Sequence, residues 1–272
     1  MEIIKAIILG IIEGITEWLP ISSTGHMILA DEFIKLNVSK EFKEVFLVVI
    51  QLGAILAVIM LFWNKLFPVS FKEKKLQVKK DTISLWMKVL VAVMPAAIIG
   101  IPFDDKIDAL FYNYQTVTAT LIIYGILFIL LEKRNRAKTS LVNGFDQLSY
   151  KTAAIIGIFQ VLSLIPGTSR SGATILGAIL IGCSREIAAE FSFFLAIPVM
   201  FGASLLKIVK FGFAFTGSEL TVLLSGMIVA FVVSIFAIKF LMGYIRRKDF
   251  TAFGYYRIVL GLIVMVYFMA FR

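Results

Sequence analysis

Two segments of this chain, 147 residues apart, share an unusual pattern: an apolar stretch is interrupted by a proline and a Ser/Thr-Gly cluster. The segments run from 6 to 30 and from 153 to 177, and eight of their 25 aligned positions are identical. A proline lacks the amide proton that a helix needs and clashes with the preceding turn. Each segment therefore predicts two half-helices joined by a break, in place of one continuous helix.

The rest of the chain consists largely of apolar runs. Apolar residues make up 60% of the sequence, far more than in a soluble globular domain. A helix that rises about 1.5 Å per residue crosses about 30 Å of hydrocarbon in about 20 residues. Six runs are long enough or nearly so, at about 42–63, 84–103, 116–132, 186–208, 219–243 and 253–271. We predict an all-α polytopic membrane protein, with 1–272 forming a single integral membrane domain.

The net charge is +9, and the positions of the basic residues along the chain indicate how the protein is oriented in the membrane. Basic residues gather in three connecting segments, 64–81, 132–151 and 244–251, whereas the segment 104–108 is mainly acidic. Cytoplasmic loops of membrane proteins are enriched in Lys and Arg. We therefore place the three basic segments in the cytoplasm, and no nucleic-acid partner is needed to explain the charge.

In each of the two broken segments, the half-helices on either side of the break are too short to span a membrane separately. Backbone groups freed at a break are tolerated at membrane depth only where protein or water satisfies them. We predict two re-entrant hairpins, the first dipping from the outer face and the second from the cytoplasmic face, because three full spans lie between them. This predicts an inverted-topology repeat of about 1–132 and 151–272, whose binding site lies where the repeats meet.

The breaks also carry ionisable and hydroxyl side chains, which are costly in apolar surroundings and usually functional. The first break is accompanied by Glu13, Glu17, Ser22, Ser23, Thr24 and His26, and the second by Ser169, Arg170, Ser171 and Thr174. Glu13 and Glu17 are four residues apart and share one helix face. His26 follows Ser23 by three residues, so we expect a contact between this hydroxyl and the imidazole if a helix starts at the serines. An arginine fork matches phosphate oxygens, and helix starts attract anions. The set predicts phosphoryl transfer or metal-assisted hydrolysis.

Repulsion between the two glutamates and a bound pyrophosphate is the reason to expect a metal cofactor. A pyrophosphate and two ionised carboxylates at about 4 Å would repel by roughly 4 kcal/mol per pair of unit charges at an effective dielectric of 20. Three arrangements relieve this: the carboxylates lie farther away, one is protonated, or a divalent cation bridges them. We favour Mg²⁺ or Ca²⁺ held by Glu13 and Glu17, because both ions prefer oxygen ligands.

The motifs that contain these residues resemble those of a known family. They are Glu13-Gly14-Ile15-Thr16-Glu17, Pro20-Ile21-Ser22-Ser23-Thr24-Gly25-His26 and Pro166-Gly167-Thr168-Ser169-Arg170-Ser171-Gly172-Ala173-Thr174. They resemble the signature motifs of the undecaprenyl-pyrophosphate phosphatase family, also called the bacitracin-resistance protein family. The resemblance covers nearly the whole chain, including Gln51-Leu52-Gly53.

This resemblance implies an activity and a setting. The activity is removal of the terminal phosphate from a C55 polyprenyl pyrophosphate lipid, which regenerates the monophosphate carrier for cell-wall synthesis. The setting is a homodimer in the bilayer of the bacterial inner membrane, with a divalent cation and an active site that opens toward the outer face.

By matching motif, the resemblance also implies residue roles. It makes Ser23 the nucleophile, His26 a proton-transfer partner and Arg170 the clamp on the pyrophosphate. Glu13 and Glu17 bind metal or activate the nucleophile. The substrate-binding candidates are Ser22, Thr24, Ser169, Ser171, Thr174 and Gln51. Direct attack by water, with Ser23 only binding substrate, is the open alternative.

Several structural explanations compete with these roles. Ser22, Ser23 and Thr24 could only cap a broken helix, and His26 could be an interior histidine with satisfied hydrogen bonds. The glutamates and Arg170 could form a structural ion pair, and Gln51 could only hydrogen-bond between helices. A secondary transporter or lipid flippase is the alternative function, since inverted repeats with charges near the midplane are typical of transporters. We prefer the enzyme because the side chains at the two breaks exceed what coupling-ion binding needs.

Overall fold

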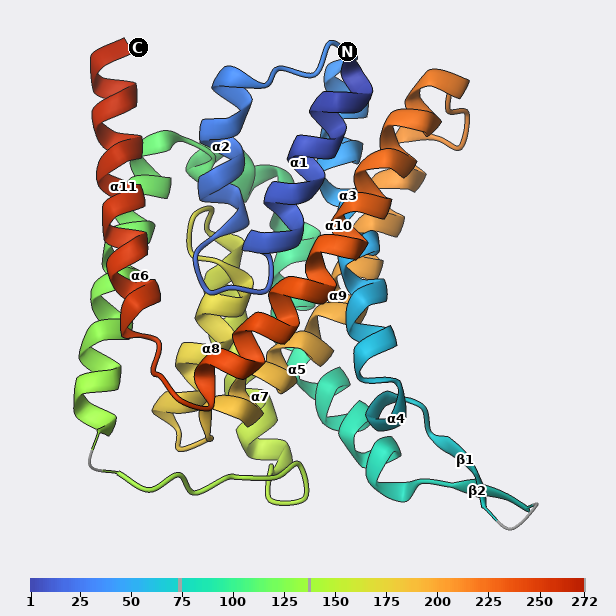
Figure 1. The fold of residues 1–272 in the computed structure, drawn as a ribbon, viewed down its shortest axis with the longest axis vertical. Helices are drawn as coiled ribbons and strands as arrows, with labels where there is room; N and C mark the ends of the chain where they lie inside the picture. The colour runs from blue at the N-terminus through green and yellow to red at the C-terminus, as the bar shows by residue number, and fades with distance from the viewer. Residues whose placement is uncertain (73–74, 137, 272) are drawn as a thin grey trace.

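The computed structural model describes residues 1–72, 75–136 and 138–271, most of which are helical (Figure 1). The helices are α1 (Glu2–Thr16), α2 (Ser23–Phe33), α3 (Lys40–Leu61), α4 (Trp63–Leu66), α5 (Lys80–Phe111), α6 (Tyr114–Asn135), α7 (Tyr150–Val161), the 3-10 turn η1 (Leu162–Leu164), α8 (Arg170–Leu180), α9 (Arg185–Phe211), α10 (Gly217–Ile245) and α11 (Thr251–Phe271). The strands β1 (Val69–Lys72) and β2 (Lys75–Val78) form a small antiparallel hairpin in which Val69 pairs with Val78.

Six of these helices are long and apolar enough to cross a membrane: α3, α5, α6, α9, α10 and α11. Each corresponds to one of the predicted runs, so the all-α polytopic fold is confirmed. The largest difference is at α5, which begins at Lys80 and ends at Phe111 with Pro95 and Pro102 inside it. Membrane helices tolerate proline because neighbouring helices and local adjustments satisfy the freed backbone groups.

The two broken segments form two helical hairpins that approach each other from opposite ends of the molecule (Figure 1). The first hairpin comprises α1, α2 and the turn between them, and it starts from the end that carries both chain termini. The second comprises α7, η1 and α8, and it starts from the other end. Their tips touch, because Ser171 Oγ donates hydrogen bonds to the main-chain oxygens of Glu17 (3.0 Å) and Leu19 (3.3 Å). Their course into and out of a bilayer stays a prediction.

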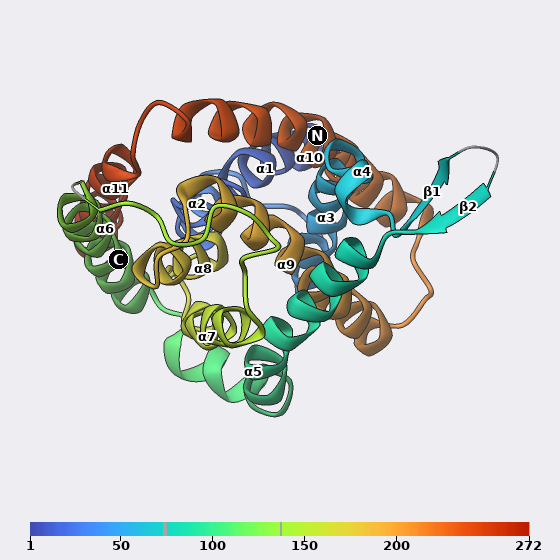
Figure 2. The ribbon, with the colours of Figure 1, turned by 90° about the horizontal axis from the view of Figure 1, so that it is seen from below.

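The predicted basic segments lie in one half of the molecule. The β1–β2 hairpin, the connection from α6 to α7 and the turn from α10 to α11 all lie toward the end opposite the termini (Figure 1). Viewed from below, the connection from α6 to α7 crosses the face of the molecule (Figure 2). Lys74, one of the lysines of the first basic segment, lies outside the described residues. This clustering agrees with the predicted alternation of the spans.

Each hairpin packs on a helix of the other half of the chain. Helix α1 lies against α10, and α7 lies against α5. The contacts are close at glycines that align in the two segments: a Cβ at Gly10 would lie 2.6 Å from the carbonyl oxygen of Gly226, and one at Gly157 would lie 2.3 Å from that of Ala92. Small residues allow helix backbones to approach in this way. The two halves therefore interlock, with reciprocal contacts.

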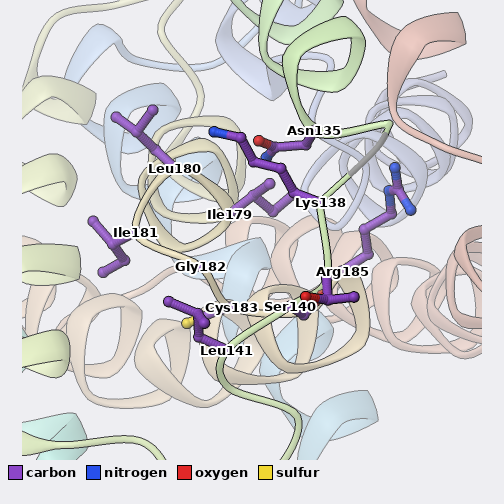
Figure 3. A pocket seen from close by; sticks show the side chains of 11 residues that line it. Asn135, Lys138, Ser140, Leu141, Ile179, Leu180, Ile181, Gly182, Cys183 and Arg185 are labelled. Carbon is purple, nitrogen blue, oxygen red and sulfur yellow. The ribbon is translucent and has the colours of Figure 1, made fainter.

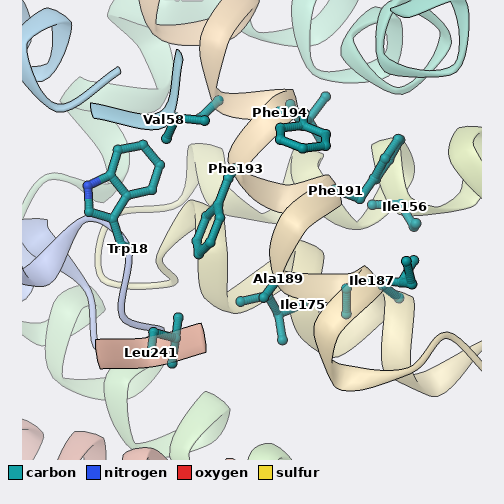
Figure 4. Packing of buried hydrophobic residues seen from close by; sticks show 14 of the residues in the cluster. Trp18, Val58, Ile156, Ile175, Ile187, Ala189, Phe191, Phe193, Phe194 and Leu241 are labelled. Atoms are coloured by element: carbon teal, nitrogen blue, oxygen red, sulfur yellow. The ribbon is translucent and has the colours of Figure 1, made fainter. Parts of the chain in front are cut away.

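The tip of the first hairpin is anchored in the main hydrophobic core. Trp18 is fully buried and packs edge-on against Phe193 of α9, with ring centroids 5.3 Å apart (Figure 4). Phe191 and Phe194 extend the same core along α9. This packing fixes the turn that follows α1, and with it the position of Glu17.

Candidate active site

An ion pair joins the two hairpin tips. Glu17 Oε1 accepts hydrogen bonds from Arg170 Nη2 (3.0 Å) and Nε (3.3 Å), and both side chains are over 90% buried. Arg170 Nη1 donates to the carbonyl oxygen (2.7 Å) and hydroxyl (3.2 Å) of Ser192 on α9. The guanidinium also lies 5.9 Å from the ring of Trp18. The acid of the first break and the arginine of the second therefore meet in one buried site.

Glu17 also contacts the predicted nucleophile. Ser23 Oγ donates to Glu17 Oε2 at 3.0 Å, while the other carboxylate oxygen of Glu17 faces Arg170. Hydrogen-bond contact between a hydroxyl and a base is the geometric requirement for nucleophile activation. One carboxylate thus lies between a hydroxyl from the first hairpin and a guanidinium from the second.

The backbone turns in the same unusual way before each of these residues. Ser22 has φ 74° and Ser169 has φ 72°, and they are the only non-glycine residues with positive φ in the described part of the chain. Each accepts a hydrogen bond on Oγ from the amide three residues on, at 3.1 Å, and so caps the next helix. Ser23 and Arg170 are the first residues of these helices, α2 and α8. Of the three predicted cap candidates, Ser22, Ser23 and Thr24, it is Ser22 that caps α2, and Ser169 caps α8 in the same way. Substrate contact by either serine stays a prediction.

His26 turns away from Ser23, the predicted nucleophile. Its Nδ1 is 2.7 Å from the carbonyl oxygen of Ser22, and its Nε2 is 2.7 Å from the hydroxyl of Tyr256 on α11. The two rings are stacked, with centroids 5.6 Å apart. A carbonyl can only accept, so Nδ1 carries a proton, and in the neutral ring Nε2 accepts from Tyr256. The hydroxyl–imidazole contact expected between Ser23 and His26 is replaced by these two bonds.

Glu13 is a buried carboxylate with spare bonding capacity. It lies one helical turn before Glu17, is 1% exposed, and its Oε1 has no hydrogen-bond partner in the described structure. The described residues contain no group of three or more His, Cys, Asp or Glu side chains placed to hold a metal. An oxygen-seeking cation here would therefore take its protein ligands from Glu13 and Glu17 and the rest from phosphate or water. The unsatisfied oxygen of Glu13 fits that arrangement.

The other predicted binding residues divide into two groups. Ser171 and Thr174 are fully buried, and their hydroxyls make bonds inside the protein: Ser171 to the first hairpin, and Thr174 Oγ1 to the carbonyl of Arg170 (2.9 Å) and the hydroxyl of Ser192 (2.8 Å). They support the tip and Arg170. Thr24, in the first turn of α2, and Gln51, on α3, are half-buried, and substrate contact by either stays a prediction.

The structure adds three residues that the sequence reasoning gave no role: Ser192 on α9, and Tyr256 and Arg257 on α11. Arg257 is fully buried and bonds to main-chain oxygens of both hairpins. The sequence could have identified Arg257, because it is an arginine inside the apolar run 253–271 and an ionisable residue inside a membrane span usually has a function.

A separate hollow of about 450 Å³ lies at the other end of α8 from Arg170 (Figure 3). Its lining includes Asn135, Lys138, Leu141 and Arg185 and none of the predicted site residues. Arg185 is held there by an ion pair with the buried Glu132, with Nε 3.0 Å from Oε1. This hollow is distinct from the candidate active site.

Comparison with known proteins places the whole chain among close relatives. The family described as bacitracin resistance protein BacA matches residues 6–263. A protein of Acetivibrio thermocellus named undecaprenyl-diphosphatase is 73% identical over 272 residues, which is all of both chains. A protein of Clostridium acetobutylicum named undecaprenyl-diphosphatase 1 is 63% identical over 270 residues, covering 99% of this chain and 98% of that one. One of Enterococcus faecalis, named undecaprenyl-diphosphatase, is 62% identical over 267 residues, covering 98% and 97%.

Proposed function

The chain belongs to the bacitracin resistance protein BacA family, and we propose that it is an enzyme that hydrolyses undecaprenyl pyrophosphate to undecaprenyl phosphate and inorganic phosphate. The names of relatives 62–73% identical along almost the full chain support this activity. The observation that carries the proposal for the site is the bridge made by Glu17, between Ser23 at 3.0 Å and Arg170 at 3.0 Å.

In the mechanism that we propose, the incoming pyrophosphate replaces Glu17 as the partner of the Arg170 guanidinium. Glu17 is then freed from its counter-ion and accepts the proton of Ser23 Oγ. The Ser23 oxygen attacks the distal phosphorus in line, forming a phosphoserine, while the bond from that phosphorus to the bridging oxygen breaks. The bridging oxygen leaves with undecaprenyl phosphate. Water then attacks the phosphoserine and gives up a proton to His26, the bond from phosphorus to Ser23 Oγ breaks, Glu17 returns its proton to that oxygen, and phosphate leaves. Arg170 supports the charge that develops in both steps.

His26 and Glu13 complete the proposed site. His26 serves proton transfer in the hydrolytic step, held in orientation by the carbonyl of Ser22 and the hydroxyl of Tyr256. Glu13 and Glu17 would hold Mg²⁺ or Ca²⁺, which when bound neutralises phosphate charge. The unpartnered oxygen of Glu13 supports this assignment.

We also propose the setting of the enzyme. The chain acts as a homodimer in the bacterial inner membrane, with the first hairpin entering from the outer face. Support for this orientation comes from the basic segments, which lie toward the end opposite the start of that hairpin. Residues 1–132 and 151–272 form an inverted repeat. The aligned serines with positive φ and the reciprocal packing of α1 on α10 and α7 on α5 support this division.

The decisive experiment is phosphate release from undecaprenyl pyrophosphate by the purified protein in detergent, with and without chelator. We expect release by the wild type, loss with chelator, and loss in Ser23→Ala. Acid quenching during turnover should trap phosphate on Ser23. Full turnover by Ser23→Ala would eliminate covalent catalysis and favour attack by water. Lipid movement across reconstituted vesicles without phosphate release would favour the flippase alternative.

A further inference from the structure

The arginine on α11 connects the two hairpin tips through their main chains. Arg257 is 0% exposed. Its Nη1 donates to the carbonyl oxygen of Pro20 at 3.2 Å, and its Nη2 donates to those of Gly167 and Thr168, each at 2.9 Å. Pro20 belongs to the first break and the other two to the second. One guanidinium therefore binds both breaks at once.

These carbonyls are the groups that a broken helix leaves without partners. The turn between α1 and α2 and that between η1 and α8 interrupt the regular helical bonding. Such freed carbonyls need a donor from the protein wherever water is excluded. An arginine suits the task because its donors form a planar fork that reaches two segments, whereas a lysine offers a compact point charge.

The surroundings leave room for this side chain but provide no acidic partner. No carboxylate pairs with Arg257 in the described residues. The guanidinium lies 5.5 Å from the ring of Tyr124, and a Cβ at Gly172 would come within 3.0 Å of Nη1. A buried charge without a counter-ion is costly. The hydrogen bonds of Arg257 to the main chains of both tips offset this cost, which indicates that the arginine holds the tips together.

We infer that Arg257 is a positioning residue that fastens the two hairpin tips to each other and so sets Ser23 opposite Arg170. This inference rests on the proposed function, in which the two hairpins supply different parts of one reaction. Loosening the tips would leave Arg170 able to bind pyrophosphate but would misplace it relative to Ser23. Misplacement by about 1 Å can cost about 100-fold in rate. The loss should therefore appear in kcat and not in KM.

The test compares Arg257→Lys and Arg257→Met with the wild type in phosphate release from undecaprenyl pyrophosphate. Lys88→Met is the matched control, because Lys88 is also a buried cation that donates to a carbonyl, that of Phe145 at 2.8 Å, away from the tips. Thermal stability and monodispersity in detergent are measured for all four proteins. Activity is assayed well below each melting temperature.

We expect both Arg257 variants to lose at least tenfold in kcat with KM within about threefold of the wild type. Lys88→Met should lose stability at most. Wild-type kcat in Arg257→Lys would overturn the inference, as would a rise in KM with kcat unchanged. Failure of both Arg257 variants to fold, with Lys88→Met folded, would assign Arg257 to folding alone and overturn it too. A wild type that releases no phosphate would refute the proposed function instead.

Discussion

The substitution Glu17→Gln removes the charge that joins the two hairpins while keeping the size of the side chain. Arg170 would then be buried without its counter-ion, and loss of one partner from a buried pair costs about 3–5 kcal/mol. Because Glu13 lies one turn away and offers a second negative charge, we expect the lower end, about 3 kcal/mol. At about 2–4 °C per kcal/mol for a chain of about this length, the melting temperature should fall by roughly 6–12 °C. Ser23 also loses its base, which should lower kcat by about 100-fold or more.

The control for this experiment is Glu190→Gln. Glu190 is buried to a similar degree, with 9% of its side chain exposed against 6% for Glu17, and it pairs with Lys65 at 2.6 Å. Lys65 is half-exposed and can return to water, so the variant should be less destabilised and should keep wild-type kcat. Phosphate release and melting temperature are measured on all three proteins, with activity assayed below the melting transition. Turnover by Glu17→Gln within threefold of the wild type, or equal loss in Glu190→Gln, would refute the reasoning.

Two further substitutions test separate features of the site. Glu13→Met removes a buried carboxylate with an unpartnered oxygen, so with chelator present the melting temperature should rise by about 2–6 °C, while activity without chelator falls at least tenfold; a lower melting temperature in chelator would contradict the unpartnered state. Ser22→Ala should lower the melting temperature by about 2–4 °C more than Ser22→Gly, because both lose the cap but only alanine resists positive φ, at a cost of about 1 kcal/mol. The same order is expected at Ser169, and equal melting temperatures for the alanine and glycine variants would count against the left-handed turns.

Local sequence pattern predicted the six long apolar helices and the two broken ones, and charge in apolar surroundings predicted that Glu17 and Arg170 would meet. The course of the broken helices through a bilayer stays a prediction. The partners that come from distant helices were missed. Tyr256 reaches His26 across 230 positions of sequence, and Ser192 lies on a helix that hydropathy identifies only as a span. Spacing within one segment suggested instead that His26 would contact Ser23. Arg257 was visible in the sequence, but nothing local connected it to carbonyls at Pro20 and Gly167.

The same backbone bend, at Ser22 and at Ser169, places two side chains of different chemistry. After each bend the opening residue of the next helix enters the centre of the molecule, and it is an alcohol in one half and a cation in the other. The neighbours of the two helix starts differ: Arg170 has the carbonyl and hydroxyl of Ser192 as acceptors, whereas Ser23 has the carboxylate of Glu17. The shared bend therefore sets where each side chain enters the molecule, and the surrounding helices set which side chain suits that place.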